Sequence, residues 1–518
     1  MGSSERPTRP STEVYAIYGV EPEVQAYAMA KYSRSSLSLK ETLREISEQK
    51  AEKFLNTFYF QYGHRSIADL AHIAFALERL SLVAAIAVVD EPRWDGQERS
   101  TRYQDFSRPD YYLPEFGGDR ALQERFTGTI DFLFAEYREL SSVMYEQLCE
   151  QTPRPAEMKR DAYERTLRAR AFDFARYLLP LATNTSLGQI VNARTLENQV
   201  SRLLSSRFPE LREIGEKLKL AANSPAYDVY GRSKHNLFDE ISGRDPALAE
   251  GSQPLLMKEV RPAPTLVKYA EPSPYAIESR KELEAAAWQL MGDAQIADAP
   301  RVDLLEDDPV EIELATTLLY EHCTYSYRQI RERVEALSEA ARQEIIDLGT
   351  RHRGKHDELL RAYCSGAKFR FDILMDVGGF RDLHRHRRCV QIGQGFCFQH
   401  GFETPEGILQ SSFAERYAAA MQHASDTAHE IAATLNAQGA DWCEAQYLLP
   451  LAYRRRTLFK MDFAEAVYIT ELRTAPAGHF SYREAAWKMY QAVAERHPSL
   501  AKHFRVCDPN APWDLLQR

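Results

Sequence analysis

The chain is poor in paired cysteines. It has seven cysteines among 518 residues, no two of them form a Cys-x-x-Cys pair, and only Cys149 lies before residue 300. This distribution is typical of a reduced intracellular protein, and it favours neither a disulfide framework nor a structural zinc site. We therefore predict no metal site.

Long apolar runs are also missing. The longest, Leu80–Val89, is too short for a membrane span, which takes about 20 residues. The segment Met1–Thr12 is polar and contains proline, so it lacks the apolar core of a signal peptide. We expect this segment to be a disordered tail, and the protein to be cytoplasmic and free of membrane contacts.

An excess of positive charge is missing as well. The net charge of −10 argues against binding to nucleic acid without regard to sequence, which needs a positive field. A small basic pocket for an anionic ligand remains compatible with this charge. The hydrophobic content of 44% and charged content of 27% are ordinary for a globular protein with large buried cores.

The chain does contain a repeated apolar hexamer. Tyr-Leu-Leu-Pro-Leu-Ala occurs at Tyr177–Ala182 and again at Tyr447–Ala452. Predicted helices open at Pro22 and at Pro309, at similar distances before the two hexamers. Such internal similarity indicates a duplicated unit, and we predict two tandem copies of one domain.

We expect the first repeat at residues 13–223 and the second at 278–518, with an insertion before the hexamer of the first repeat. Residues 224–277 hold seven prolines and are predicted to form a linker or extended arm. Apolar periodicity predicts strands at Leu70–Leu77 and Phe369–Met375, and either type at Ser81–Val89. The expected helices are Glu21–Ser33, Ser38–Phe58, Phe126–Leu148, Pro155–Tyr177, Leu196–Leu204, Pro309–Tyr320, Tyr325–Ile346, Ser412–Leu435 and Phe463–Leu472.

Three polar clusters could carry chemistry. The first is the run His384–Arg388, which is either a solvated basic patch or a pocket for a phosphate-bearing ligand, since arginine offers paired planar donors. The second is Glu98–Tyr103. If this stretch is extended, Glu98, Ser100 and Arg102 share one side and could hold a phosphorylated sugar; the alternative is a surface strand with a charge pair.

The third cluster combines Asn192, Arg194 and Asn198. At the start of a helix these amide and guanidinium donors suit a nucleotide base or phosphate. The alternative is an asparagine N-cap on a solvated helix.

Together these strings resemble the flavin-dependent thymidylate synthases. That family has His-x-Ser/Thr-x-x-Glu, then Arg-His-Arg, seven residues and Ser-x-Arg-Tyr, and later Leu-Pro, Asn-Ala-Arg and a catalytic arginine. The first repeat matches at positions spread along its length, and it has Asp90-Glu91-Pro92 in place of Arg-His-Arg and Leu203 in place of the catalytic arginine. The matching positions are His64, Ser66, Glu98, Ser100, Arg102, Arg176, Asn192, Arg194 and Asn198.

The second repeat shows the opposite losses. Arg385-His386-Arg387 is intact, and Arg473 stands at the catalytic position. In contrast, Gly395–Phe398 replaces Ser-x-Arg-Tyr, and Gln446 replaces the arginine before the hexamer. Because family members draw their active sites from several subunits, the resemblance implies that the two repeats complement each other around a shared site.

The resemblance implies an α+β fold in each repeat, with helices packed on a twisted, mostly antiparallel sheet. It implies reductive methylation of dUMP to dTMP with FAD as cofactor, and methylenetetrahydrofolate and NADPH as co-substrates. It also implies a homodimer, in which four repeats replace the family's tetramer. We expect a small-molecule nucleotide as partner and no nucleic acid.

The implied residue roles follow the motifs. Arg473 is the expected catalytic residue, because it would stabilise negative charge on the uracil ring. Expected to bind substrate are Glu98, Ser100, Arg102, Arg176 and Arg385. Expected to bind the flavin are His64, Ser66, Asn192, Arg194, Asn198, Arg385, His386 and Arg387.

Three alternatives remain open from the sequence. The departures from the family pattern are compatible with hydroxymethylation of a uridine nucleotide by flavin chemistry. They are also compatible with a non-catalytic flavin- or nucleotide-binding protein. A nucleic-acid binder that uses His384–Arg388 is disfavoured by the acidic total.

Overall fold

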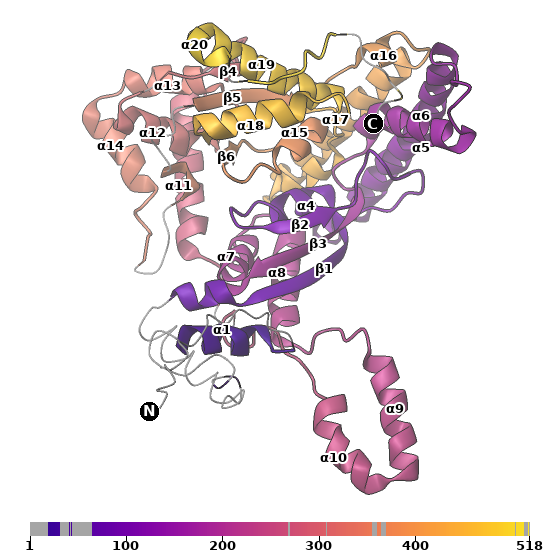
Figure 1. The fold of residues 1–518 in the computed structure, drawn as a ribbon. Coiled ribbons are helices and arrows are strands. Elements are labelled where there is room, and N and C mark those ends of the chain that lie inside the picture. The colour runs from indigo at the N-terminus through magenta and orange to yellow at the C-terminus, as the bar shows by residue number, and fades with distance from the viewer. Residues whose placement is uncertain are drawn as a thin grey trace, which may run out of the picture. The chain divides into compact units, whose positions relative to one another are not determined.

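The computed structural model describes residues 19–31, 41, 43, 65–267, 270–306, 308–354, 360–363, 369–502, 504–511 and 516. The predicted tail, His64 and nearly all of the predicted helix Ser38–Phe58 lie outside these residues. The described residues form many helices and two small antiparallel sheets (Figure 1), which confirms the α+β class. None of the helices formed by these residues is long and apolar enough to cross a membrane.

The chain divides into two compact units. The smaller unit contains residues 1–73, 191–198 and 217–270, and the larger unit contains residues 74–190, 199–216 and 271–518. The larger unit therefore holds most of the first repeat and all of the second. The repeat boundaries themselves stay a prediction.

The stretch predicted to be a proline-rich linker or extended arm contains helices that belong to the smaller unit. Two helices, α9 (Gly231–Arg244) and α10 (Pro246–Leu256), fill much of this stretch and pack against each other (Figure 1). Pro246 stands in the first turn of α10, where no backbone N–H is needed, and the Asp245 side chain accepts a hydrogen bond from Leu248 N at 3.0 Å. Proline thus marks the start of a helix here.

Two short helices complete the smaller unit. Helix α1 (Pro22–Lys31) contacts η2 (Arg65–Leu70). Glu23 of α1 is buried, and its carboxylate accepts hydrogen bonds from Thr265 N at 2.8 Å and Leu266 N at 2.5 Å. The predicted helix Glu21–Ser33 is confirmed over Pro22–Lys31, and its last two residues lie outside the described residues.

Corresponding sheets of the two repeats are the main feature of the larger unit. One has the strand order β1 (His72–Ser81), β3 (Asn184–Asn192), β2 (Asp95–Glu98), and its outermost residues at one end belong to the smaller unit. The other has the order β4 (Val302–Leu304), β5 (Phe369–Asp376), β7 (Arg454–Met461), β6 (Val390–Gly393). The predicted strands correspond to β1 and β5, whereas β3 and β7 were not predicted.

The strand registers match between the two repeats. Asp95 pairs with Ile190 in the first sheet, and Val390 pairs with Lys460 in the second. Ile190 and Lys460 stand at the same position relative to their own hexamers. Asp95 and Val390 are therefore equivalent as well, and this aligns the repeats on both sides of the insertion.

Helix caps follow the same alignment. The Ser81 side chain caps α4 (Leu82–Val88), and the Asp376 side chain caps α15 (Val377–Leu383). Ser81 precedes Asp95 by as many residues as Asp376 precedes Val390. The strand, the cap and the short helix of one repeat thus recur in the other.

The two hexamers pair with each other about an approximate twofold axis. Leu181 N donates to Leu449 O at 2.9 Å, and Leu451 N donates to Leu179 O at 3.0 Å. The two donors, Leu181 and Leu451, are equivalent residues of the hexamers, and so are the two acceptors. Exchanging the repeats therefore turns one hydrogen bond into the other. Pro180 and Pro450 form the antiparallel bridge at the centre, and the duplicated motif is therefore the seam between the repeats.

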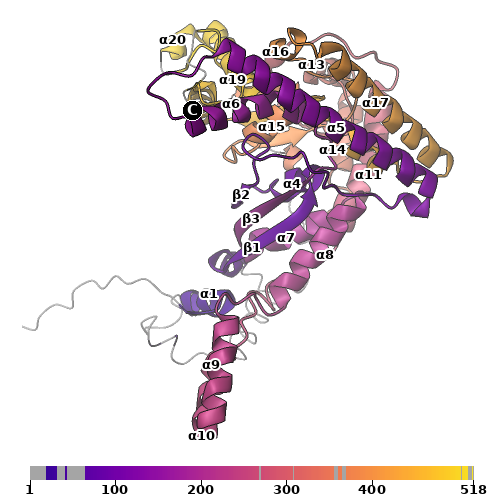
Figure 2. The same cartoon turned by 90° about the vertical axis from the view of Figure 1, so that its right-hand side faces the viewer.

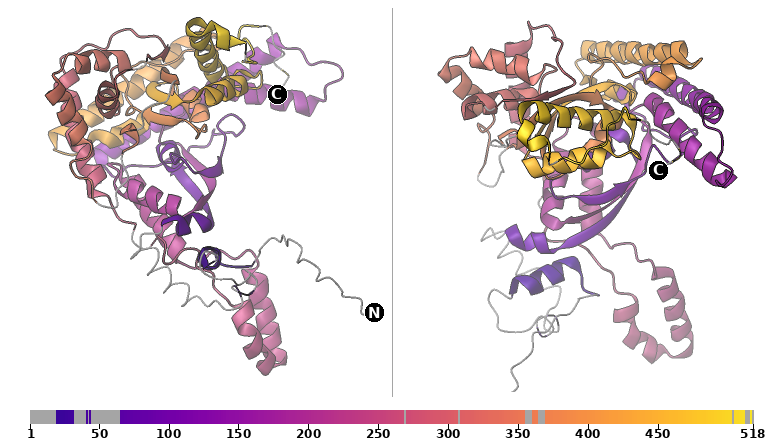
Figure 3. Two further views of the ribbon diagram at one scale, coloured as in Figure 1. Left: turned by 60° about the vertical axis from the view of Figure 1, so that its left-hand side comes forward. Right: turned by 45° about the horizontal axis from the view of Figure 1, so that its top comes forward.

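Helices bury both faces of the four-stranded sheet. Phe371 and Ile373 of β5 belong to the main core. Leu458 of β7 belongs to a second core, with helices α11 (Pro274–Met291), α12 (Val310–Tyr320), α13 (Tyr327–Glu335) and α14 (Glu339–Leu348). Helices α18 (Phe463–Thr474) and α19 (Phe480–Arg496) contact each other, and α19 lies against β4 and β5 (Figure 3). Helices α5 (Arg120–Gln151) and α17 (Ala414–Ala437) run beside each other (Figure 2).

The predicted helix Tyr325–Ile346 is wrong in one respect, because it consists of two helices, α13 and α14. The Ser338 side chain caps the second of them, and a serine cap ends the pattern that apolar spacing alone would continue. The other helices and 3₁₀ turns of the larger unit are η3 (Phe116–Gly118), α5 (Arg120–Gln151), α6 (Arg160–Ala175), η4 (Arg176–Leu178), α7 (Ala193–Leu204), α8 (Pro209–Asn223), α11 (Pro274–Met291), α12 (Val310–Tyr320), α13 (Tyr327–Glu335), α14 (Glu339–Leu348), η5 (Arg361–Tyr363), α16 (Glu406–Leu409), α17 (Ala414–Ala437), η6 (Trp442–Leu448), α18 (Phe463–Thr474), α19 (Phe480–Arg496) and α20 (Pro498–Ala501), with α7 and α8 shared between units.

Candidate active site

Arg102 of the first repeat lies in the turn after β2 and is locked in place by protein acceptors. Its Nε and Nη2 donate to the two carboxylate oxygens of Asp173 at 2.7 and 3.1 Å. Its Nη1 donates to the Tyr482 hydroxyl at 3.1 Å, and Nη2 also reaches Ala477 O at 3.3 Å. Burial acts to lower the pKa of Arg102, but Asp173 outweighs it and holds this pKa above its ordinary value.

Tyr482 brings together residues from the two repeats. The Arg102 guanidinium lies 5.8 Å from the centre of its ring, and the Arg473 guanidinium lies 5.4 Å from the same centre. Both distances fall in the range of cation–π contacts. The predicted substrate-side residue of the first repeat and the predicted catalytic residue of the second therefore lie against one aromatic ring.

Arg473, in the last turn of α18, is oriented by a histidine. Its Nε donates to His386 Nε2 at 2.8 Å, and His386 Nδ1 lies 3.7 Å from the Glu465 carboxylate. Burial lowers the pKa of His386, and the nearby Glu465 only partly opposes this. A neutral His386 can accept from Arg473 while Nδ1–H points toward Glu465, and this arrangement fixes the tautomer.

The neighbours of His386 differ in their surroundings. Arg387 lies with its guanidinium 4.5 Å from the ring centre of Trp94, a buried first-repeat residue whose Nε1 donates to Gln189 at 2.6 Å. Burial lowers the pKa of Arg387, and its Nε has no hydrogen-bond partner among the described residues. Arg385 is exposed.

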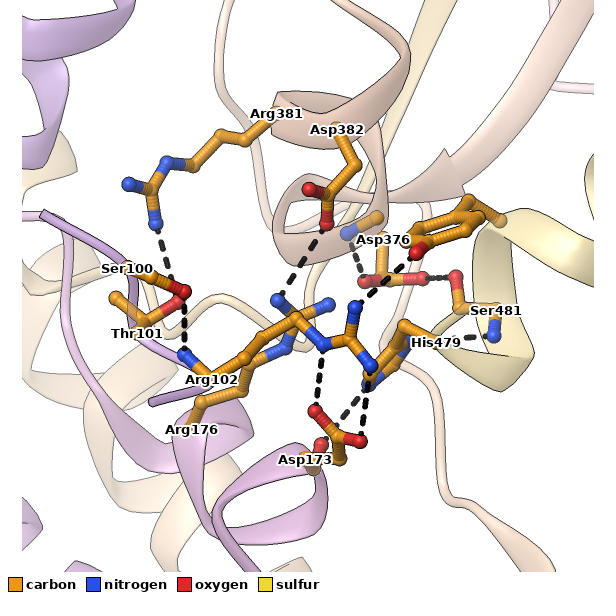
Figure 4. Close-up of polar contacts among 12 residues, drawn as sticks. Ser100, Thr101, Arg102, Asp173, Arg176, Asp376, Arg381, Asp382, His479 and Ser481 are labelled. Carbon is orange, nitrogen blue, oxygen red and sulfur yellow. Dashed lines mark hydrogen bonds and ion pairs between the residues drawn. The ribbon is translucent and has the colours of Figure 1, made fainter. Parts of the chain in front are cut away.

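Arg176, just before the first hexamer, is a buried cation with unused donors. It is 2% exposed, and its nearest acidic atom is Asp382 Oδ2, 3.6 Å from Nη1 (Figure 4). Its Nε and Nη2 have no hydrogen-bond partner in the part of the chain that the structure describes. Buried guanidinium donors are normally satisfied, so this arginine suits an anionic ligand.

Asp376 and Ser481 lie next to Arg176. The Asp376 carboxylate accepts a hydrogen bond from Gly379 N at 2.6 Å and another from the Ser481 hydroxyl (Figure 4). Burial raises the pKa of Asp376 to about 6, against the opposing effects of Ser481 and Arg176. The group therefore titrates close to neutral pH.

His479 closes the cluster from the second repeat. It is fully buried, its Nε2 lies 2.9 Å from Asp173 O, and its Nδ1 accepts from Ser481 N at 3.2 Å (Figure 4). Burial and the nearby Arg176 and Arg102 keep its pKa well below the ordinary value. A neutral ring then donates from Nε2 to the backbone and adds no charge to the cluster.

The remaining residues of the Glu98–Tyr103 stretch contact α15. Glu98 forms an ion pair with Arg381, and their side chains are 10% and 9% exposed. Ser100 Oγ accepts from Arg102 N at 3.2 Å (Figure 4). We expected Glu98, Ser100 and Arg102 to share one side if the stretch were extended. The strand β2 ends at Glu98 and residues 101–103 form a turn, so this condition is not met.

The third predicted cluster lies in the smaller unit. Asn192 caps α7, since its Oδ1 accepts from Thr195 N at 2.8 Å. Arg194 lies 3.4 Å from the Asp69 carboxylate, which joins this cluster to the motif that contains Ser66 in η2. Asn198 is partly buried on the same helix.

Several residues of the cluster carry no local sequence signal. Asp173 is 71 residues from Arg102, and Tyr482 is 380 residues from it. Neither residue belongs to a short motif, and only the folded chain brings them together. An unusual density of buried charge on α6, with Arg170 and Asp173, is the one weak pointer.

Comparison with known proteins places the chain in a family. The model of the thymidylate synthase complementing protein family matches residues 17–221 and 302–499, one match in each repeat. Since these matches span most of the chain, the chain belongs to this family, the flavin-dependent thymidylate synthases. The predicted resemblance and its two-copy form are thereby confirmed.

Individual relatives are 26–28% identical to this chain over the aligned residues. A UPF0159 protein of Chlamydia pneumoniae is 27% identical over 541 aligned positions, covering 97% of this chain and 93% of that protein. A UPF0159 protein of Thermoplasma acidophilum is 26% identical, covering 93% of this chain and 94% of that protein. A flavin-dependent thymidylate synthase of Clostridium tetani is 28% identical over 182 residues, covering 35% of this chain and 69% of that protein.

Among solved structures, a flavin-dependent thymidylate synthase of Helicobacter pylori in complex with FAD and dUMP matches with 15% identity and a TM-score of 0.26. That match covers 39% of this chain and 88% of the other.

Proposed function

We propose that the protein methylates dUMP to dTMP reductively, at a composite site in the larger unit that both repeats supply. The observation that carries this proposal is the shared Tyr482 ring, which has Arg102 of the first repeat and Arg473 of the second against it. Membership of the flavin-dependent thymidylate synthases supports the reaction class.

In this proposal Arg473 faces the uracil ring and stabilises the negative charge that develops there. His386 and Glu465 hold its guanidinium in one orientation, so no reorganisation is needed when the charge appears. His386 is thus a positioning residue as well as a neighbour of the flavin.

The proposed phosphate anchors are Arg176 and Arg385, with the Ser100 hydroxyl. Arg176 has two unused buried nitrogen donors, which suit charge-assisted hydrogen bonds to phosphate. We propose a different role for Arg102, because its guanidinium already donates hydrogen bonds to Asp173, Tyr482 and Ala477. It holds the turn that carries Ser100 against the second repeat.

The residues present fit FAD, which carries an anionic diphosphate. Arg385 is exposed, and Arg387 has an Nε without a hydrogen-bond partner among the described residues, beside the Trp94 ring, so both can offer donors to such a group. When bound, the flavin supplies the hydride of the reduction, NADPH the electrons and methylenetetrahydrofolate the carbon. The other flavin contacts expected from the family motifs, which stay a prediction, are Ser66, Asn192, Arg194 and Asn198.

The test is product analysis with the purified chain, FAD, NADPH, methylenetetrahydrofolate and dUMP. We expect dTMP, identified by mass spectrometry, from a yellow protein with a flavin spectrum. A hydroxymethylated uridine product would instead identify the alternative reaction. If the protein binds flavin but converts no nucleotide to product, the proposed function is wrong.

A variant pair assigns the catalytic arginine. Arg473→Ala is expected to lower kcat by at least roughly 100-fold, the usual effect of losing a group that stabilises transition-state charge, while flavin stays bound. The matched control is Arg388→Ala, which removes an exposed cation near His386 that pairs with Asp462 at 3.1 Å. Equal activity of the two variants would remove Arg473 from the mechanism.

We further propose a homodimer, in which two chains supply four repeats. Light scattering on the purified protein measures its mass directly. A monomer with full turnover would contradict this proposal and leave the composite site intact, since its residues in the larger unit come from one chain.

A further inference from the structure

The larger unit contains a cavity of about 1090 Å³, and its lining includes none of the residues that we propose for the active site. Its lining includes Gly395, Cys397 and Gln446 of the second repeat, together with residues of the first. In the alignment of the two repeats, these three residues are the counterparts of Ser100, Arg102 and Arg176. The approximate twofold axis of the hexamers therefore relates this cavity to the candidate active site.

The chemistry of this cavity differs from that of the active site. A glycine, a cysteine and a glutamine stand where the first repeat has a hydroxyl and two guanidinium groups. A new cation is present instead, because Arg455 occupies the position that corresponds to Thr185. The cavity therefore lacks the hydroxyl and guanidinium groups that we propose for phosphate binding and support in the first repeat. An arginine, Arg455, stands instead at a different position of its lining.

Arg455 is held rigidly without a carboxylate. Its guanidinium lies 4.8 Å from the ring centre of Phe380 and 4.6 Å from that of Phe396, and its Nε donates to Gln394 O at 2.7 Å. No ion pair joins it to any of the described residues, and burial lowers its pKa to about 10. Gly393 leaves room for it, since a Cβ there would lie 2.4 Å from Arg455 Nη2.

Two buried acceptors also line the cavity. His384 is 8% exposed and Gln394 is 1% exposed, and His384 Nε2 and Gln394 Oε1 have no hydrogen-bond partner among the described residues. The carboxylate nearest to His384 Nε2 is that of Asp90, at 3.9 Å, and it is already paired with Arg361.

The tautomer of His384 follows from its other ring nitrogen. Nδ1 must carry the proton, because it faces Gln391 Oε1 at 2.9 Å while Gln391 Nε2 donates to His386 O. Nε2 is then the acceptor of this ring. The His384 ring lies 5.0 Å from the Phe380 ring, which also contacts Arg455.

We propose that this cavity is a second small-molecule site, which takes an aromatic or heteroaromatic carboxylate that bears an N–H group. The carboxylate pairs with Arg455, the N–H group donates to His384 or Gln394, and the ring lies on the apolar wall that includes Phe398 and Ala428. A monoanion fits better than a phosphate dianion, since Asp90 and Glu321 lie near enough to act on Arg455.

Calorimetry on the full flavin-loaded chain tests this proposal with three matched probes. Indole-3-acetate has both the acid and the N–H group, its methyl ester lacks the negative charge, and 1-naphthylacetate lacks the N–H group. We expect one indole-3-acetate per chain. The ester should bind at least roughly tenfold more weakly, as expected for the loss of a charge-assisted hydrogen bond, and 1-naphthylacetate several-fold more weakly.

Variants then assign the binding to Arg455. Arg455→Met should weaken indole-3-acetate at least roughly tenfold and leave the ester unchanged. The matched control is Arg207→Gln, which removes another cation of the lining that is already paired with Asp441 at 3.0 Å. Saturating dUMP should not displace the probe, because dUMP is expected at the other site.

Four results would overturn the proposal. In the first, indole-3-acetate does not bind at millimolar concentration, and in the second, the acid and its ester bind equally well. In the third, the Arg455→Met variant binds indole-3-acetate as tightly as the natural chain does, and in the fourth, dUMP displaces indole-3-acetate. If Arg455→Met does not fold, the comparison of acid and ester on the natural chain still decides. The proposal holds whether or not dUMP is the substrate at the first site.

Discussion

Replacing Asp173 by alanine should destabilise the larger unit by about 3–5 kcal/mol, the usual cost of breaking a buried ion pair from one side. The Arg102 and Asp173 side chains are 8% and 4% exposed, so solvent screens this pair little. Without the carboxylate, Arg102 keeps Tyr482 and Ala477 as acceptors but loses both of its hydrogen bonds to a charged group. Arg170, whose Nη1 lies 3.8 Å from Asp173, loses a counter-charge at the same time.

A double-mutant cycle separates the pair from its surroundings. Arg102→Met combined with Asp173→Ala removes both charges, so the double variant should be less destabilised than the sum of the single variants by about 2 kcal/mol. Thermal and urea unfolding, followed by tryptophan fluorescence and far-ultraviolet circular dichroism, give the four midpoints. Additive effects within about 0.5 kcal/mol would show that the two residues act independently, and they would refute the structural role of Arg102.

Three further predictions concern the candidate active site. Arg176→Met should raise the KM for dUMP at least roughly tenfold, as expected for a lost charge-assisted bond, with kcat changed less; an unchanged KM in steady-state assays would exclude Arg176 as the phosphate anchor. Asp376 has its pKa raised from 3.8 to about 6 by burial, so the protonated carboxyl contributes stability below pH 4 that is lost as the pH rises through about 6. Asp376→Asn should remove up to about 3 kcal/mol of this pH dependence, and parallel stability–pH curves for the two proteins would contradict the assignment. Trp94→Leu should weaken FAD several-fold by removing the cation–π contact to Arg387, with flavin fluorescence titration as the measurement and unchanged affinity as the opposing result.

Much of the repeat architecture was predictable from short strings. The hexamers, and the spacing from each basic-cluster position to the following motif, align the same residues that the strand registers align. Helices α5 and α17 each bury one face. The prediction for α17 lies within two residues of its observed bounds, and that for α5 covers residues 126–148 of the observed 120–151. In these elements local periodicity and tertiary burial agree.

Other helices and strands were not predicted, either because their sequences lack apolar periodicity or because nearby prolines indicated a linker. Strand β7 begins with Arg454 and Arg455, and burial on both faces removes the alternation that marks a half-exposed strand. Helices α9 and α10 have almost no buried side chain, so apolar periodicity had nothing to indicate there. The prolines around them suggested a linker, although Pro246 occupies a helix start.

The candidate site was predictable as a set of residues, but not as a set of contacts. Arg473 and Arg102 were identified by motif position, yet the ring that both contact, Tyr482, lies in no motif. Similarly, Asp173 could not be identified as the partner of Arg102, since sequence spacing carries no information about a contact across 71 residues. Because of that contact, we propose that Arg102 holds the turn that carries Ser100 in place and does not bind the ligand itself.

The hydrogen bonds that pair the two hexamers join backbone groups, and this has an evolutionary consequence. In an assembly of identical subunits, every substitution appears at all symmetry-related places at once, so no two of them can be given different tasks. Joining both halves in one polypeptide lifts that restriction, while the backbone hydrogen bonds of the seam preserve the geometry. A single gene can then keep one catalytic centre and adapt its counterpart to another ligand.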